Sequence, residues 1–200
     1  MAPRGLGGLL RLRLAELAPD RPRRRLGPAG PREAGATIFI LAPFSPGVRE
    51  GDQAKSREAL ATASRAGWEV RRIELPQGSP LSYWEALRDH WDDPVDWLVV
   101  EHDVAPSVDL VTEMAACPRL LCTRGYGLPV PGDPWAVMLG CTKFSARARQ
   151  RTGWPLPEPV AWHLLDSYLT GAVVARLGLD EGWHQHTAPL VHYHGRKEAT

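Results

Sequence analysis

The sequence has few cysteines, almost no net charge and no long apolar run. Three Cys among 200 residues are too few for a disulfide-built scaffold, and they favour a reduced, cytoplasmic setting. A formal net charge of +1 gives no large electrostatic footprint for nucleic acid, so we expect no nucleic-acid partner. The longest apolar runs are far below the ~20 residues of a membrane-spanning helix, so we expect no transmembrane segment. The length suits one domain with a full core.

The positive charge is concentrated at the start of the chain. Residues 1–35 contain eight Arg and three acidic residues among many Pro and Gly, and we predict a flexible basic leader there. The leader lacks the apolar stretch and cleavage site of a secretory signal. It is either a frayed segment or an arm that touches an anionic membrane surface or a nucleic acid. We expect a single domain over 36–195 and a frayed tail over 196–200.

Strand-like and helix-like patterns alternate from residue 36 onward. We expect strands over 36–44, 68–75, 96–106, 120–128, 134–145 and 189–194, and helices over 52–67, 80–93, 107–117, 146–153 and 161–178. Ser82 and Ser107 are the expected N-caps of their helices, with Glu85 as the capping-box partner of Ser82. The alternation predicts an α/β, Rossmann-like, mostly parallel sheet with helices on both faces, and a small mixed region at the C-terminus.

An acidic triplet, Glu101-His102-Asp103, lies near the carboxyl end of the predicted strand 96–106. Because side chains alternate along a strand, we expect Glu101 and Asp103 on one face. Ligands of open parallel sheets bind outside the carboxyl ends of the strands. Two carboxylates there would hold a hard cation such as Mg²⁺ or Mn²⁺. The alternative is a solvated strand end with ordinary acids.

Four of the seven histidines fall within eleven residues: His184, His186, His192 and His194. Each pair has the spacing i, i+2, so its two rings share one face of a strand. A zinc site needs three or four converging nitrogen or sulfur ligands, which two such pairs could supply. Three interpretations stay open: polar side chains on a terminal strand, one His added to a carboxylate-held metal, or a self-sufficient zinc site.

Other residue types offer weaker signals. Asp166 lies early in the predicted helix 161–178, where the helix dipole favours a negative charge, so it is either a capping acid or a base aimed into a cleft. The three Cys are expected as small buried hydrophobes. Most of the eight Trp are expected in the core, while Trp135, Trp162 or Trp183 could form a platform for a sugar ring.

The order of these elements resembles the nucleotide-sugar glycosyltransferases of GT-A fold (glycosyltransferase-2-like), in a short version covering about residues 36–195. The resemblance rests on four segments: VVEHDVAP (99–106), MLGCTKFSARARQRTG (138–153), LLDSYL (164–169) and LVHYHG (190–195). The first resembles the DxD metal motif of the family, with Glu101 in place of the first Asp and Asp103 matching the last. The second is similar to the family's Gly-loop strand on the acceptor side.

The other two segments imply further site residues. LLDSYL resembles the xED segment whose final Asp is the catalytic base of inverting members, which implies Asp166 in that role, with Leu165 in place of the Glu. The last segment resembles the C-terminal His that completes metal coordination, and both His192 and His194 fit. Glu74 is the acid nearest to the position that binds the base of the nucleotide.

The resemblance implies a metal-dependent glycosyltransferase that moves a sugar from a nucleotide-sugar donor to a hydroxyl acceptor. Mn²⁺ or Mg²⁺, held by Glu101, Asp103 and a C-terminal His, would neutralise the diphosphate as it leaves. Asp166 would take the proton of the acceptor. Lys143 or Arg124 would assist the phosphates.

Two other functions stay open at this point. One is a zinc-dependent hydrolase that uses Asp103 with the histidines, namely His184, His186, His192 and His194. The other is a non-catalytic GT-A-like module that uses the basic leader as a docking arm.

Overall fold

The computed structural model describes residues 38–47, 50–124, 139–178, 183–186, 188 and 190–192. Among them, six strands form a sheet in the order β2-β1-β3-β6-β5-β7, and β4 and β8 form a second, small sheet. The strands are β1 (Ile38–Phe44), β2 (Glu69–Glu74), β3 (Asp96–Val100), β4 (Val104–Pro106), β5 (Leu121–Thr123), β6 (Cys141–Phe144), β7 (Trp183–Gln185) and β8 (Leu190–His192). The helices are α2 (Glu50–Arg65), α3 (Ser82–Asp89), α4 (Val108–Ala116), α5 (Ala146–Thr152) and α6 (Trp162–Leu177).

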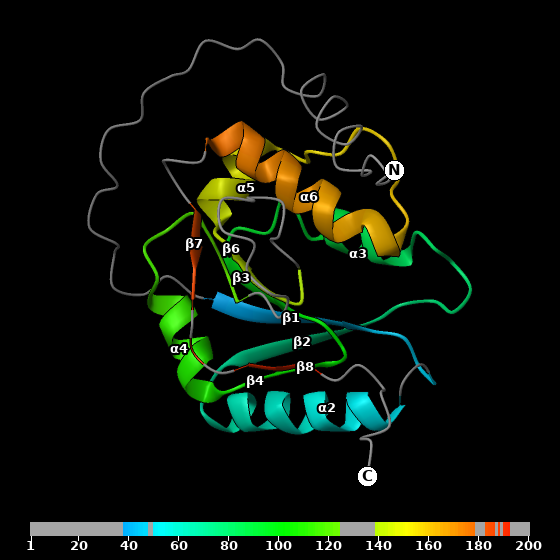
Figure 1. Ribbon diagram of the computed structural model, residues 1–200, viewed down its shortest axis with the longest axis vertical. Helices are drawn as coiled ribbons and strands as arrows, with labels where there is room; N and C mark the ends of the chain where they lie inside the picture. The colour runs from blue at the N-terminus through cyan, green and yellow to red at the C-terminus, as the bar shows by residue number, and fades with distance from the viewer. Residues whose placement is uncertain are drawn as a thin grey trace, which may run out of the picture.

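The large sheet is mostly parallel. Strand β1 pairs in parallel with both β2 and β3, and β5 pairs in parallel with β7, whereas β6 is antiparallel to its neighbours β3 and β5. All strands except β6 therefore point the same way, and their carboxyl ends share one edge of the sheet. Helices α3, α5 and α6 cover one face, and α2 and α4 with the small sheet cover the other (Figure 1). The predicted Rossmann-like α/β fold is confirmed.

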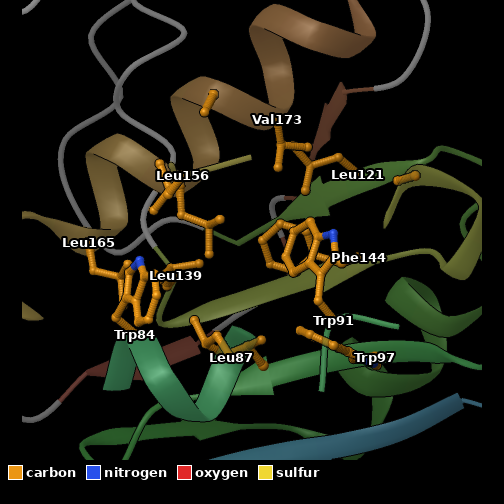
Figure 2. Packing of buried hydrophobic residues seen from close by; sticks show 14 of the residues in the cluster. Trp84, Leu87, Trp91, Trp97, Leu121, Leu139, Phe144, Leu156, Leu165 and Val173 are labelled. Carbon is orange, nitrogen blue, oxygen red and sulfur yellow. The ribbon is translucent and has the colours of Figure 1, made fainter. Parts of the chain in front are cut away.

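Side chains alternate along the buried strands and pack into two separate cores. On β3, Trp97 and Val99 face α3, α5 and α6, while Leu98 and Val100 face α2 and α4. The first core is aromatic: Trp91 makes edge contacts with Trp97 at 5.6 Å and with Trp154 at 5.0 Å between ring centroids. Figure 2 shows Trp91 and Trp97 below Val173 of α6. Burial of such large rings is a main source of stability for the domain.

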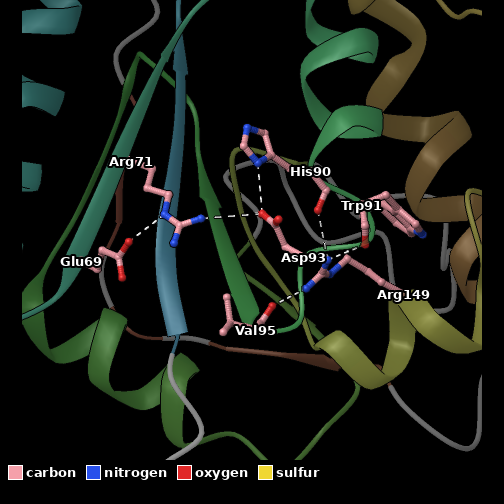
Figure 3. Close-up of polar contacts among 7 residues, drawn as sticks. All are labelled: Glu69, Arg71, His90, Trp91, Asp93, Val95 and Arg149. Carbon is pink, nitrogen blue, oxygen red and sulfur yellow. Dashed lines mark hydrogen bonds and ion pairs between the residues drawn. The ribbon is translucent and has the colours of Figure 1, made fainter.

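A buried arginine closes the aromatic core. Arg149 of α5 is 1% exposed and donates to the backbone carbonyls of His90, Trp91 and Val95 (Figure 3). Its guanidinium also lies 4.1 Å from the centroid of the Trp97 ring. Burial lowers the pKa of Arg149 to about 10, so the side chain is still charged at neutral pH. One side chain thereby fixes the loop between α3 and β3 to α5.

The predicted strand 96–106 is in fact two strands, β3 and β4, separated by residues 101–103. Strand β3 ends at Val100, and residues 101–103 form a turn in which the amide of Val104 donates to the carbonyl of Glu101 at 3.1 Å. The chain then enters β4 in the small sheet. Apolar residues flank the acids on both sides, so the run looks continuous although its halves pair with different partners. The expected strand alternation of Glu101 and Asp103 does not apply in this turn.

The predicted helix caps and the predicted C-terminal strand can also be compared with the structure. Ser107 caps α4, since its hydroxyl accepts from the amide of Leu110 at 3.1 Å, as predicted. Ser82 does not cap α3: it is the first helical residue, and its hydroxyl donates to the carbonyl of Ser79. Strand β7 was not predicted, because three residues carry no periodicity. The leader, the tail, Trp135 and His194 lie outside the described residues.

The described helices include none with both the length and the apolar character that a membrane span requires.

Candidate functional site

The acid turn, residues 101–103, lies where β3 leaves the large sheet. The amide of Glu101 donates to the carbonyl of Gly140 at 3.1 Å, just before β6. The carbonyl of Glu101 accepts from the hydroxyl of Ser56 on α2 at 3.3 Å. Asp103 is 5% exposed and Glu101 is half-buried. The turn is thus held from two sides, by α2 and by the Gly-containing segment predicted to adjoin the acceptor.

The small sheet brings the C-terminal segment to the acid turn. In the antiparallel pairing of β4 with β8, Val104 lies opposite His192 and Pro106 lies opposite Leu190. The backbone of His192 therefore lies across from the residue that directly follows Asp103. Residues far apart in the sequence, which the family resemblance assigns to one metal, meet in the same part of the fold.

Two further predicted site residues lie towards the same edge of the large sheet. Glu74 is exposed at the end of β2, where it pairs with Phe44 at the end of β1. Helix α6 starts near this edge, because the amide of Trp162 donates to the carbonyl of Pro80, in the loop after β2, at 2.9 Å. Asp166 lies half-buried in the second turn of α6. Trp162 is 61% exposed, as a sugar platform requires.

Lys143, a predicted phosphate contact, lies in the interior of the protein. Its side chain is fully buried, and Nζ donates to the carbonyls of Met114 at 3.1 Å and Cys117 at 2.6 Å. It also lies 3.9 Å from a carboxylate oxygen of Asp96. The ammonium thus satisfies carbonyls at the end of α4, and we leave Lys143 out of the site proposed below. Arg124 follows β5, and its Nε donates to the carbonyl of Ala188 at 2.6 Å.

A second cluster of chemically active side chains lies between α4 and β7. Cys117, the C-cap of α4, and the rings of His184 and His186 each offer a ligand atom, and these atoms lie within 4.8 Å of one another. The sulfur of Cys117 is 3.5 Å from Nδ1 of His184. Nδ1 of His186 is 2.7 Å from a carboxylate oxygen of Glu113 on α4. The spacing of the two histidines was the only signal of this cluster in the sequence.

The cysteines differ in their ionisation. Hydrogen bonding with Cys122 is the largest effect on Cys117 and lowers the pKa of its thiol, with help from the backbone at Arg119 and from the two histidines, against the opposing effect of burial. The same hydrogen bond, together with burial, raises the pKa of Cys122. Burial raises the pKa of Cys141 to about 12. All three cysteines are thus small buried core residues, as expected, and the lowered pKa of Cys117 also suits it to bind a metal as a thiolate.

The described members of the two histidine pairs lie in different parts of the fold. His184 belongs to β7 at the edge of the large sheet, whereas His192 belongs to β8 in the small sheet. His184 and His186 lie beside Cys117, whereas the backbone of His192 lies next to the acid turn. The fold therefore divides the predicted His cluster between two candidate sites.

Comparison with known proteins found a likeness among solved structures. No protein-family model matches the chain, and no curated protein does. Among solved structures, the chain is similar to one described as "Crystal structure of a glycosyltransferase involved in the glycosylation of the major capsid of PBCV-1", with a TM-score of 0.49 and 13% identity over 80% of this chain and 94% of that chain. At this level of likeness, function has to be argued from the residues themselves.

Proposed function

We propose that the protein is a metal-dependent glycosyltransferase that moves a sugar from a nucleotide-sugar donor to a hydroxyl acceptor, on a GT-A-like fold. The observation that carries the proposal is the pairing of β4 with β8, which brings His192 to the acid turn. Metal ligands from the middle and from the C-terminal end of the domain would then meet at the carboxyl end of a buried strand, where open parallel sheets bind their ligands.

The donor set fits a hard divalent cation. Glu101 and Asp103 offer carboxylate oxygens, and His192 or His194 offers an imidazole, a combination that suits Mn²⁺ or Mg²⁺ shared with phosphate. Such a cation, when bound, supplies charge neutralisation for the departing diphosphate. Hydrogen bonds from the Glu101 backbone to Gly140 and from Ser56 to the Glu101 carbonyl hold the backbone of the turn in place.

The acceptor side is assigned to α6. Asp166 would accept the proton of the attacking hydroxyl as general base. Trp162, exposed one turn earlier on the same helix, would stack against a sugar ring. Glu74, exposed at the end of β2, would bind the nucleoside.

The metal site is tested by Asp103→Asn, with Asp109→Asn as the matched control, because Asp109 is an exposed acid on α4. A panel of nucleotide sugars is incubated with Mn²⁺, and slow hydrolysis of the donor is measured together with the thermal shift. We expect Asp103→Asn to lose about 10²–10³-fold in donor hydrolysis and to lose the metal-dependent thermal shift. Normal hydrolysis by Asp103→Asn, or no nucleotide-dependent shift in the unmodified protein, would contradict the proposal.

The base is tested separately by Asp166→Asn. We expect the variant to keep Mn²⁺-dependent donor binding while transfer to the acceptor falls about 10²–10⁴-fold. Equal turnover by the variant and the unmodified protein would remove Asp166 from the mechanism and leave the metal site standing.

A further inference from the structure

The cluster between α4 and β7 contains a buried histidine with an unused ring nitrogen. His186 is 3% exposed, and within the described part of the chain its Nε2 has no hydrogen-bond partner. Its Nδ1 is already engaged with Glu113 at 2.7 Å. A buried nitrogen without a partner costs free energy, and a ligand that uses its electron pair would recover that cost.

We propose that Cys117, His184 and His186 bind a zinc ion, at a site separate from the carboxylate-held cation of the proposed glycosyltransferase.

The spacing of the side chains matches zinc coordination. With Zn–S and Zn–N distances of about 2.3 Å and about 2.0 Å, two ligands at the tetrahedral angle lie about 3.5 Å apart. The sulfur of Cys117 lies 3.5 Å from Nδ1 of His184. One ligand atom from each of the three residues falls within 4.8 Å of the others, so the three side chains would have to draw slightly closer around the ion.

Glu113 completes the arrangement from outside the ligand shell. Zinc-binding histidines generally donate their second N–H to a carboxylate, which fixes the tautomer and leaves the other nitrogen free for the metal. The contact between Glu113 and Nδ1 of His186 has this form, and it directs Nε2 to the ligand role.

The ligand chemistry selects zinc over the cation of the acid turn. A thiolate and two imidazoles suit Zn²⁺, whereas Mg²⁺ and Mn²⁺ prefer oxygen ligands. Since His184 is exposed, we expect a water molecule to supply the fourth ligand. The ion would join the end of α4 to β7, an edge strand that pairs with β5 over only three residues. Zinc would therefore hold that edge in place.

The test measures zinc binding by the untagged full chain. The protein is stripped with a chelator, titrated with Zn²⁺ alone, and analysed for bound metal after gel filtration. We expect one zinc per chain, a fall of more than about 100-fold in affinity for Cys117→Ser and His186→Gln, and a fall of about 10–100-fold for Glu113→Gln. Co²⁺ in place of zinc should give a thiolate charge-transfer absorption that Cys117→Ser lacks.

Matched variants control for general damage. Cys141→Ala and His90→Gln alter a cysteine and a histidine outside the cluster and should bind zinc like the unmodified protein. Asp103→Asn should also keep zinc, which separates this proposal from the failure of the proposed function. If a ligand variant does not fold, the proposal is tested instead by whether zinc protects Cys117 of the unmodified protein from alkylation. An unmodified chain without zinc affinity, ligand variants that bind normally, or unprotected Cys117 would each overturn the proposal.

Discussion

The two faces of the large sheet are built from different side chains. Beneath α3, α5 and α6 the core is aromatic, and the buried guanidinium of Arg149 closes it. Beneath α2 and α4 the core is aliphatic and sulfur-containing, with Met114 in contact with the sulfur of Cys141 at 3.6 Å. Both candidate metal sites adjoin this second face. The sulfur-containing face thus adjoins both proposed metal sites, whereas the proposed base, Asp166, belongs to α6 on the aromatic face.

Helix α2 connects the second face to the proposed active site. The buried side chain of Gln53 donates to the carbonyl of Ser45, after β1, at 2.7 Å. Ser56, three residues later on the helix, donates to the carbonyl of Glu101 in the acid turn. Polar residues are costly in a core unless they are paired, so we infer that their positions on α2 serve the loops at the carboxyl edge.

The largest effect is expected from removing an aromatic ring. Trp91→Ala should lower the free energy of unfolding by about 3–5 kcal/mol, because a fully packed ring leaves a cavity. Urea denaturation measures this, and zinc affinity, measured where the variant is folded, should be unchanged. Leu110→Ala on the other face, expected at about 2–5 kcal/mol, is the comparison. A loss of zinc affinity in Trp91→Ala would show that the two faces of the sheet are not independent.

Arg149→Met should lower the free energy of unfolding by about 3 kcal/mol, because three buried carbonyls lose their donor. Arg149→Lys should restore only part of this loss, since one ammonium cannot reproduce the geometry of the guanidinium. Thermal and urea unfolding measure both variants. Equal stability of Arg149→Met and the unmodified protein would show that the cluster closes without the charge.

We expect a helix cap to contribute the same stability on either face of the sheet. Ser107 caps α4 on one face and Ser145 caps α5 on the other, each accepting from an amide three residues on. Ser107→Ala and Ser145→Ala should each cost about 1 kcal/mol in urea unfolding. Ser79→Ala, outside both helices, is the control. A much larger loss for Ser145→Ala would mean that its burial, rather than capping, sets its contribution.

The smallest intervention changes only pH. Because the pKa of Cys117 is lowered, its alkylation in the chelator-treated protein should be nearly independent of pH between about pH 6 and pH 8. An ordinary thiol would react about tenfold faster per pH unit in this range. In this pH range the thiol of Cys117 is protonated in the unfolded chain but ionised in the folded protein. Its ionisation therefore makes the free energy of unfolding rise with pH up to the ordinary thiol pKa. Mass spectrometry of the labelled residue gives the profile, and Cys141, whose pKa is raised to about 12, should stay unlabelled.

Local patterns predicted much of the fold because they act over short distances. The apolar run before Phe44 predicted β1, and Ser107 before an apolar helix predicted its cap. The turn after Val100 was not predicted, because only the pairing of β3 with β6 and of β4 with β8 distinguishes it from a continued strand. Ser82 failed as a cap because the helix starts one residue earlier than a cap at Ser82 requires.

The sequence by itself determined the helices and the longer strands, the near-absence of disulfide chemistry, and the acids and histidines available as ligands. Only the tertiary structure decided which of these residues meet. Cys117 and His184 are neighbours because β7 pairs beside β5, and His192 approaches Asp103 because β8 pairs with β4. Periodicity records which side of an element faces the core, whereas contacts between distant segments depend on strand pairing across the whole chain.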